Sequence, residues 1–312
     1  MRPMMRSLCL FAAVTLVLSS CGSEGGDSTT TTDEVTTTTV APTTSTTEAP
    51  TTTFTEPSTT TTTAPVAAGI AAYFLLEELE EGAGGPFLVP VYRPASAEPD
   101  LATASMEALV AGPSEDETVG TPSISTAIPE GTSVLGVEVE NGRAAVDLSD
   151  EFDDGGGSFS MFARLAQVVY TLTRVDGVDE VEFTIEGQPV TVFSGEGIEL
   201  DGPQERADYY DQLPPIFVDS PAWGEPVISP VHVSGLSNVF EAVSQVMLTD
   251  DDGLTLFEDT VMASCGTGCW GQWEVDIPFT IDREQFGSLI VWEISAEDGS
   301  RINIREYPVQ LR

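Results

Sequence analysis

Two kinds of hydrophobic periodicity divide the chain beyond about residue 70. From Phe87 to Phe193, apolar residues recur with helical spacing in some segments and alternate with polar residues in others. Beyond Pro214 the period is two almost throughout. The first pattern indicates an α+β domain, with two helices on one side of a mostly antiparallel sheet. The second predicts an all-β, immunoglobulin-like sandwich.

Two helices are expected in the first domain. "LATASMEALVAG" follows Asp100, a good N-cap, and stops at Gly112-Pro113. Its spacing places Leu101, Ala104, Ala108 and Leu109 on one side. In "FSMFARLAQVVYTLTRV", the spacing predicts a buried face of Phe162, Leu165, Ala166, Val169 and Leu172.

Strands are expected before, between and after these helices along the chain. "FLVPVYRP", "VDEVEFTIEG" and "QPVTVF" have strand composition, and Asn141-Gly142 between two alternating runs predicts a tight hairpin. In the second domain, alternation predicts strands near Val231–Ser234, Val243–Thr249, Leu254–Ala263, Gln272–Phe279, Ser288–Ser295 and Ile302–Gln310.

The amino-terminal segment has the pattern of a secretory signal. Arg2 and Arg6 precede an apolar run, Leu8 to Leu18, that is shorter than the roughly 20 residues of a membrane-spanning helix. The ending Leu18-Ser19-Ser20-Cys21 resembles the lipobox of bacterial lipoproteins, which implies removal of residues 1–20 and lipid attachment at Cys21. The alternative is an ordinary signal cleaved near Ser20. No second membrane segment is expected.

Residues 21–68 predict a disordered tether. The segment is mostly Thr, with Ser, Pro and Ala, and it lacks apolar periodicity. As a coil it would span roughly 40 Å, and fully extended roughly 140 Å. Such composition is typical of O-glycosylated stalks, although a spacer without sugar fits equally well.

The charge balance excludes several partners. The chain has 51 Asp and Glu against 11 basic residues, all of them Arg, for a formal net charge of −40. Such a protein repels nucleic acid and anionic headgroups. The charge favours cationic partners or metal ions, or serves only solubility.

A polar stretch ending in two prolines, "DGPQERADYYDQLPP", marks the expected boundary between the domains. We therefore predict domains at residues 69–206 and 207–312, each of ordinary size.

Longer segments of the first domain resemble the GerMN domain of sporulation and spore germination proteins. They are "EALVAGPSEDE", "STAIPEGTSVLGVEVENGRAAVDLSDEF" and "LAQVVYTLTRVDGVDEVEFTIEGQPVTVF", and the resemblance runs from about Tyr73 to Arg206. The shared residues are mostly caps, turns and core. The resemblance implies a noncatalytic domain that also occurs in envelope lipoproteins of bacteria that do not sporulate.

The second domain has a resemblance of its own. "PPIFVDSPAWGEPVISPVHVSGLSNVFEAVSQVML" and "LIVWEISAEDG" resemble the immunoglobulin-like domain of bacterial spore germination. That domain often follows the GerMN domain directly, as it does here.

Catalytic chemistry finds little support in the residue types. The single histidine, His232, is expected on the outer face of its strand, and no G-x-S-x-G motif accompanies it. The chain has no lysine, which excludes a Schiff base or a P-loop lysine. We expect no enzyme activity, no cofactor and no resident metal.

Cys265 and Cys269 are the strongest local chemical signal. Two of the three residues between them are Gly, so the loop can fold back to bring the Cα atoms within about 5 to 6 Å. In an exported protein we expect a disulfide that staples this loop. A redox role or a zinc site is the weaker reading.

Two acidic segments remain as candidate sites. "TDDDG", residues 249–253, either holds calcium or forms a hairpin turn, and the turn is favoured. In "DLSDEFDDGGG", Asp147, Ser149 and Phe152 lie at a strand-to-helix junction that can offer free amides to a ligand. Asp147 and Ser149 could equally serve neighbouring backbone groups.

Together these features predict a lipid-anchored protein on the outer face of the bacterial cytoplasmic membrane, in the cell envelope. We expect it to bind peptidoglycan, another wall polymer or another envelope protein through its two domains. The alternative is a solute-binding or metal-binding lipoprotein that serves a transporter, although the chain lacks the large two-lobed α/β body typical of that class.

Replacing Cys21 with Ala tests the anchor, because lipidation and cleavage both require the thiol. We expect an uncleaved precursor of higher mass that is lost from its normal membrane fraction. The readout is intact mass and fractionation of cells that express the variant or the parent protein. Unchanged mass and unchanged membrane retention would contradict the lipoprotein prediction.

Overall fold

A computed structural model describes residues 69–78, 84–95, 100–195 and 197–312. The predicted signal peptide, Cys21 and the Thr-rich tether lie outside these residues. The described residues belong to one compact unit. None of the helices in this part of the chain is long and apolar enough to cross a membrane.

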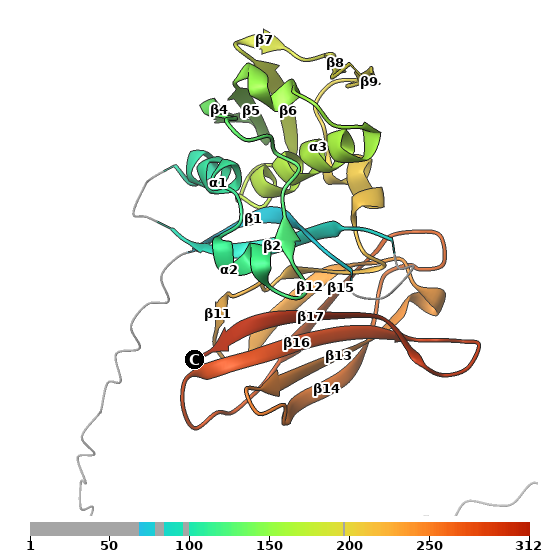
Figure 1. Cartoon of the computed structure of the whole chain (residues 1–312). Coiled ribbons are helices and arrows are strands. Elements are labelled where there is room, and N and C mark those ends of the chain that lie inside the picture. Colours follow the sequence, from blue (N-terminus) through green and yellow to red (C-terminus); the bar gives the residue numbers. More distant parts are fainter. Residues whose placement is uncertain (1–68, 79–83, 96–99, 196) are drawn as a thin grey trace, which may run out of the picture. The chain divides into compact units, whose positions relative to one another are not determined.

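The first half begins with a three-stranded sheet of order β2-β1-β3 (Figure 1). Its strands are β1 (Gly69–Leu76), β2 (Phe87–Pro94) and β3 (Ile124–Ser125). In β1, every residue from Ala71 to Leu76 is buried. This strand was not among those predicted, because burial on both faces removes the alternation that identifies a strand.

A second sheet has the order β4-β5-β6-β7. Its strands are β4 (Val134–Glu140), β5 (Arg143–Leu148), β6 (Glu180–Ile185) and β7 (Gln188–Pro189). The predicted hairpin is confirmed, since β4 and β5 pair across Asn141 and Gly142, whose φ angles are 53° and 87°. β5 and β6 are parallel, and the rest of this sheet is antiparallel. A small ribbon follows, β8 (Val192–Phe193) and β9 (Ile198–Glu199).

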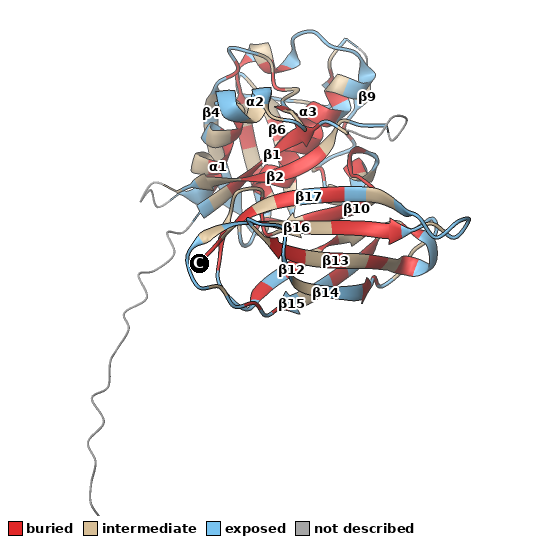
Figure 2. Ribbon diagram, turned by 60° about the horizontal axis from the view of Figure 1, so that its bottom comes forward, coloured by how far each residue is buried: buried red, intermediate tan, exposed pale blue. Residues whose placement is uncertain are grey.

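Helix α3 (Ser158–Leu172) connects β5 to β6 and packs against β1, β2 and β6 (Figure 1). The residues from Ala163 to Leu172 are all buried. Figure 2 shows α3, β1 and β2 mostly in the colour of buried residues. The predicted face is therefore right for four residues and wrong for Phe162, which is 40% exposed. Sheets on two sides bury this helix almost completely.

The other helices of this half are α1 (Leu101–Val110) and α2 (Glu115–Val119). Asp100 caps α1 as predicted, accepting hydrogen bonds from the amides of Ala102 and Thr103. The predicted face is wrong for Leu101, which is 43% exposed, whereas Leu109 is buried and Ala104 and Ala108 are partly buried. The buried residues are Ala102, Ser105, Met106 and Leu109. The helical spacing of the apolar residues is correct, but the buried face is rotated from the predicted one. The three alanines of α1 fit on either side of the helix equally well.

The second half is the predicted sandwich of two sheets. The smaller has the order β10-β12-β15, with β10 (Ile216–Ser220), β12 (Val231–Ser237) and β15 (Gly271–Ile277). The larger has the order β11-β17-β16-β13-β14. Its strands are β11 (Pro226–Val227), β13 (Val243–Asp250), β14 (Thr255–Met262), β16 (Gln285–Ile294) and β17 (Arg301–Leu311).

Two loops of the sandwich follow the sequence prediction. The sulfurs of Cys265 and Cys269 are bonded, with the Cα atoms 6.0 Å apart. The loop that they close is tied to its surroundings by the amide of Gly268, which donates to Asn238 Oδ1 over 2.8 Å. "TDDDG" forms a turn in which Asp250 Oδ1 accepts from the amides of Asp252 and Leu254.

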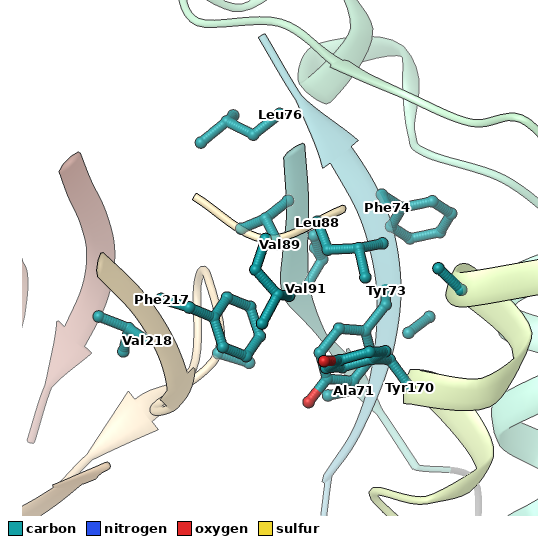
Figure 3. Packing of buried hydrophobic residues seen from close by; sticks show 14 of the residues in the cluster. Ala71, Tyr73, Phe74, Leu76, Leu88, Val89, Val91, Tyr170, Phe217 and Val218 are labelled. Atoms are coloured by element: carbon teal, nitrogen blue, oxygen red, sulfur yellow. The ribbon is translucent and has the colours of Figure 1, made fainter. Parts of the chain in front are cut away.

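The two halves share one hydrophobic core (Figure 3). Phe217 of β10 lies with its ring centroid 6.4 Å from that of Tyr73 and 5.9 Å from that of Tyr170. Backbone bonds also cross, because Tyr92 donates to the carbonyl of Trp223 over 2.9 Å and Trp223 donates to that of Pro90 over 2.8 Å. The segment 206–212, at the predicted domain boundary, is a 3-10 helix, η2 (Arg206–Gln212), with Tyr209 buried. The halves are therefore packed as a unit.

Candidate functional site

The three residues of the predicted pocket all have partners inside the first half. Asp147 Oδ1 accepts from Thr184 Oγ1 and from the amide of Gly187, both over 2.9 Å. Ser149 Oγ accepts from the amide of Ser133 over 2.9 Å. Phe152 is fully buried. These contacts give the residues structural roles, and the ligand pocket at this junction stays a prediction.

Arg164 organises the same junction and was missed by sequence analysis. Its side chain is buried in α3, where Nε donates to the carbonyl of Ala127 over 3.0 Å. Its two terminal nitrogens donate to the carbonyls of Phe152 and Gly155. The only sequence signal was an arginine in the middle of an apolar helix. Burial lowers the pKa of this guanidinium despite the nearby carboxylates of Asp153 and Asp154.

His232 lies on the outer face of β12, as predicted, with more than half of its side chain exposed. Its Nδ1 is 2.9 Å from Asp276 Oδ1 on the neighbouring strand. Among the described residues, no group of three or more His, Cys, Asp or Glu side chains is arranged to hold a metal ion.

The most connected polar group lies where the two halves meet, around Asp219. Its Oδ2 pairs with Arg206 Nη1 over 2.8 Å and with Arg174 Nη1 over 3.4 Å. The hydroxyl of Tyr73 donates to Oδ1 of the same carboxylate. Arg174 also donates to the backbone carbonyl of Asp219 over 2.7 Å. One aspartate of the second half thus binds three side chains of the first, and we call this group the Asp219 cluster.

Local structure explains how each member reaches the cluster. Asp219 is the extra residue of a bulge in β10, where the pairing with β12 shifts between Val218 and Ser220. Such a bulge re-aims a side chain out of the regular alternation. Arg174 follows the carboxyl end of α3, and Arg206 begins η2, whose amino end is closed by a reciprocal cap between Glu205 and Asp208.

The charges in the cluster stabilise one another. Burial acts to raise the pKa of Asp219, but the guanidinium groups of Arg206 and Arg174 outweigh it and hold that pKa below its usual range. Burial and the negative charge of Asp219 raise the pKa of Tyr73 to about 12. The phenol therefore stays protonated at neutral pH and serves as a hydrogen-bond donor.

A groove of about 970 Å³ opens beside the Asp219 cluster. The first half contributes Thr173, Arg174, Val178, Asp179 and residues 205–207 and 210. The second half contributes Asp219, residues 234–236, residues 262–264 and residues 272–274. Tyr210 packs against Trp270, which follows the disulfide, with the ring centroids 5.5 Å apart and the planes tilted by 39°. Both halves are needed to form this groove, which is the candidate functional site.

The sequence predicted binding through the two domains but indicated none of the residues of this groove. Along the chain, Asp219 lies 13 positions from Arg206, 45 from Arg174 and 146 from Tyr73. Neither spacing nor residue type brings such residues together. The feature of the sequence that could have indicated Asp219 is an acidic residue in the short apolar run that follows two prolines.

Two family models match the chain. The model of the sporulation and spore germination family, Germane, matches residues 71–191. The model of the immunoglobulin-like domain of bacterial spore germination, Gmad2, matches residues 215–300. The groove is lined by residues within both matches and by residues 205–207 and 210, which lie between them.

Among solved structures, the chain is similar to the first GerMN domain of the sporulation protein GerM from Bacillus subtilis. The identity is 20%, the TM-score is 0.38, and the match covers 45% of this chain and 99% of the other. The tandem GerMN domains of the same protein match at 17% identity and a TM-score of 0.38, over 68% of this chain and 61% of theirs. No curated protein matched the sequence.

Replacing Asp219 with Asn tests the cluster. The variant leaves two partly buried arginines and a tyrosine without their anion, so we expect a loss of about 1–3 kcal/mol in the free energy of unfolding. Asp276→Asn, at the exposed pair with His232, is the matched control, and its effect should stay within about 0.5 kcal/mol. Chemical denaturation at neutral pH measures both.

The pH dependence adds a second readout. A carboxyl whose pKa is lowered in the folded state contributes stability above its unfolded pKa of about 3.9, and this contribution is lost as the pH falls through the folded value. The difference between the parent and Asp219→Asn should be constant above about pH 5 and shrink below about pH 4. A difference equal to that of the control, or independent of pH down to acid unfolding, would contradict the role of the cluster.

Proposed function

We propose a binding function for this chain, which carries a domain of the sporulation and spore germination family followed by the immunoglobulin-like domain of bacterial spore germination. In this proposal the protein is a noncatalytic, lipid-anchored component of the cell envelope. It binds a wall polymer or an envelope protein, and the groove beside the Asp219 cluster is its contact surface.

The envelope location has two sources of support. Both families are those of envelope-associated proteins of sporulation and spore germination. The lipobox-like ending at Cys21 and the Thr-rich tether would hold the folded unit outside the cytoplasmic membrane at a distance set by the tether. The signal and the lipid are expectations that the Cys21→Ala experiment tests.

A noncatalytic role is supported by how the ionisable groups of the groove are used. Neither matching family is known for enzymes. Arg174 and Arg206 are both bound to Asp219, and the raised pKa of Tyr73 keeps its phenol from acting as a base at neutral pH. His232, the only histidine, pairs with an exposed aspartate on a strand surface.

The observation that carries the proposal is the position of the groove. It is lined by both halves, and the shared core and the Asp219 cluster hold those halves in place. A preformed groove lets a partner bind without the cost of ordering two mobile domains. A groove that both domains line therefore gives a reason for the two domain types to occur in one chain and to act as one binding unit.

Obstructing the groove tests this function. Ala207 is exposed and lines the groove, so Ala207→Trp fills part of it with a bulky ring. Ala296, exposed in the turn between β16 and β17, gives the matched control Ala296→Trp. We expect Ala207→Trp to reduce the recovery of crosslinked partner from intact cells about tenfold or more, because a clash in a packed interface costs more than about 1.4 kcal/mol.

Equal recovery with the two tryptophan variants, in proteins that unfold at the same denaturant concentration, would remove the groove as the contact surface. Turnover of peptidoglycan, esters or peptides by the purified protein, abolished by His232→Ala, would overturn the noncatalytic reading.

A further inference from the structure

We infer that the occupant of the groove is a basic, partly apolar polypeptide segment of an envelope protein, an inference that rests on the binding function proposed above. It selects the protein partner over the wall polymer. Some charges of the groove are already neutralised within the protein and others are not, and the difference favours this partner.

The positive charges of the groove are neutralised internally. Its lining contains two arginines and four carboxylates, a formal charge of −2. Arg174 and Arg206 both pair with Asp219 at the junction of the two halves. This leaves the other three carboxylates, those of Asp179, Glu205 and Glu274, which are exposed and have no arginine partner in the described part of the chain. Glu274 Oε2 lies 4.0 Å from Nε2 of His232, which carries a charge only when protonated.

Within the described part of the chain, no arginine forms an ion pair with any of these three acids. The chain has no lysine, and each of the nine arginines beyond residue 68 has an intramolecular contact. Arg93, for example, pairs with Glu117, Arg143 with Glu180, and Arg283 with Asp251. Cations that complement the rim of the groove must therefore come from the partner.

The acidic surface continues beyond the groove. Glu205 also lines an adjoining depression of about 440 Å³ on the other side of η2. That depression contains Glu199, Asp201 and Asp208 and no arginine, and it includes Phe162, the helix residue that is exposed against expectation. An extended segment that crosses η2 would meet carboxylates on both sides, with an aromatic ring beside them.

Apolar groups in the groove require a partner with apolar side chains as well. Met262 is 74% exposed at its edge, and Val178, Leu236 and Tyr210 line it. Methionine surfaces adapt to varied apolar partners. A segment that alternates basic and apolar residues matches both kinds of group, whereas a neutral glycan offers no cation to the acids.

The test measures binding of a short synthetic peptide of alternating lysine and leucine to the full chain. We compare it with a glutamate–leucine peptide and with soluble peptidoglycan fragments. The groove variant is Asp179→Asn/Glu205→Gln/Glu274→Gln. The matched control, Asp282→Asn/Glu258→Gln/Glu284→Gln, removes one aspartate and two glutamates that are exposed and line neither depression.

We expect the lysine–leucine peptide to bind and the groove variant to weaken its Kd about tenfold, because exposed ion pairs each contribute about 0.2–1 kcal/mol. The control variant should bind like the parent protein. Raising the salt from about 0.05 M to about 0.5 M should remove most of the difference, since screening shortens the range of exposed charges.

Equal weakening by the two triple variants, or preferential binding of the glutamate–leucine peptide or the peptidoglycan fragments, would overturn the inference. If Ala207→Trp abolishes partner recovery from cells while the lysine–leucine peptide does not bind, the binding function stands and the basic partner is wrong. If Ala207→Trp changes nothing in cells, both are wrong.

Discussion

The structure depends on one carboxylate placed between two arginines. Asp219 leaves the regular alternation of β10 through a bulge and accepts bonds from Tyr73, Arg174 and Arg206 of the first half. Leaving any of these groups partly buried without its partner would cost free energy. The geometry of the cluster therefore fixes how the halves meet. The shared core of Tyr73, Tyr170 and Phe217 packs beside the cluster and excludes water there. The groove opens beside the cluster as well, with Asp219 in its lining.

The use of arginine follows from the same constraint. In a chain with 51 carboxylates and no lysine, a cation is scarce, and the guanidinium fork can bind several oxygens at once. Arg164 ties three backbone carbonyls, Arg206 bridges Thr173 and Asp219, and Arg305 joins Glu78 of the first half to the second. Because most of the arginines in the described part of the chain pair with its own carboxylates, the surface keeps the excess of negative charge, including the rim of the groove.

The sequence predicted local structure well where a single residue decides the geometry. Asn141-Gly142 requires positive φ at both positions, and Asp100 can cap a helix on its own, so both features were correct. Strand β1 and the exposure of Phe162 were not predicted, because both depend on packing against segments that are distant in the sequence. The groove shows the same limit, since its residues come from β10, β12, β15, η2 and the end of α3. The spacing of these residues along the chain does not indicate that they lie close together in the fold.

If the two halves form one unit around Asp219, they should unfold together, and unfolding of the full chain followed by two probes measures this. All four tryptophans, Trp223, Trp270, Trp273 and Trp292, lie in the second half, whereas α1 and α3 lie in the first. Tryptophan fluorescence and the helical circular dichroism signal therefore report different halves. The account predicts one coincident transition with denaturant. Two transitions with separate midpoints would show that the halves unfold independently and would contradict it.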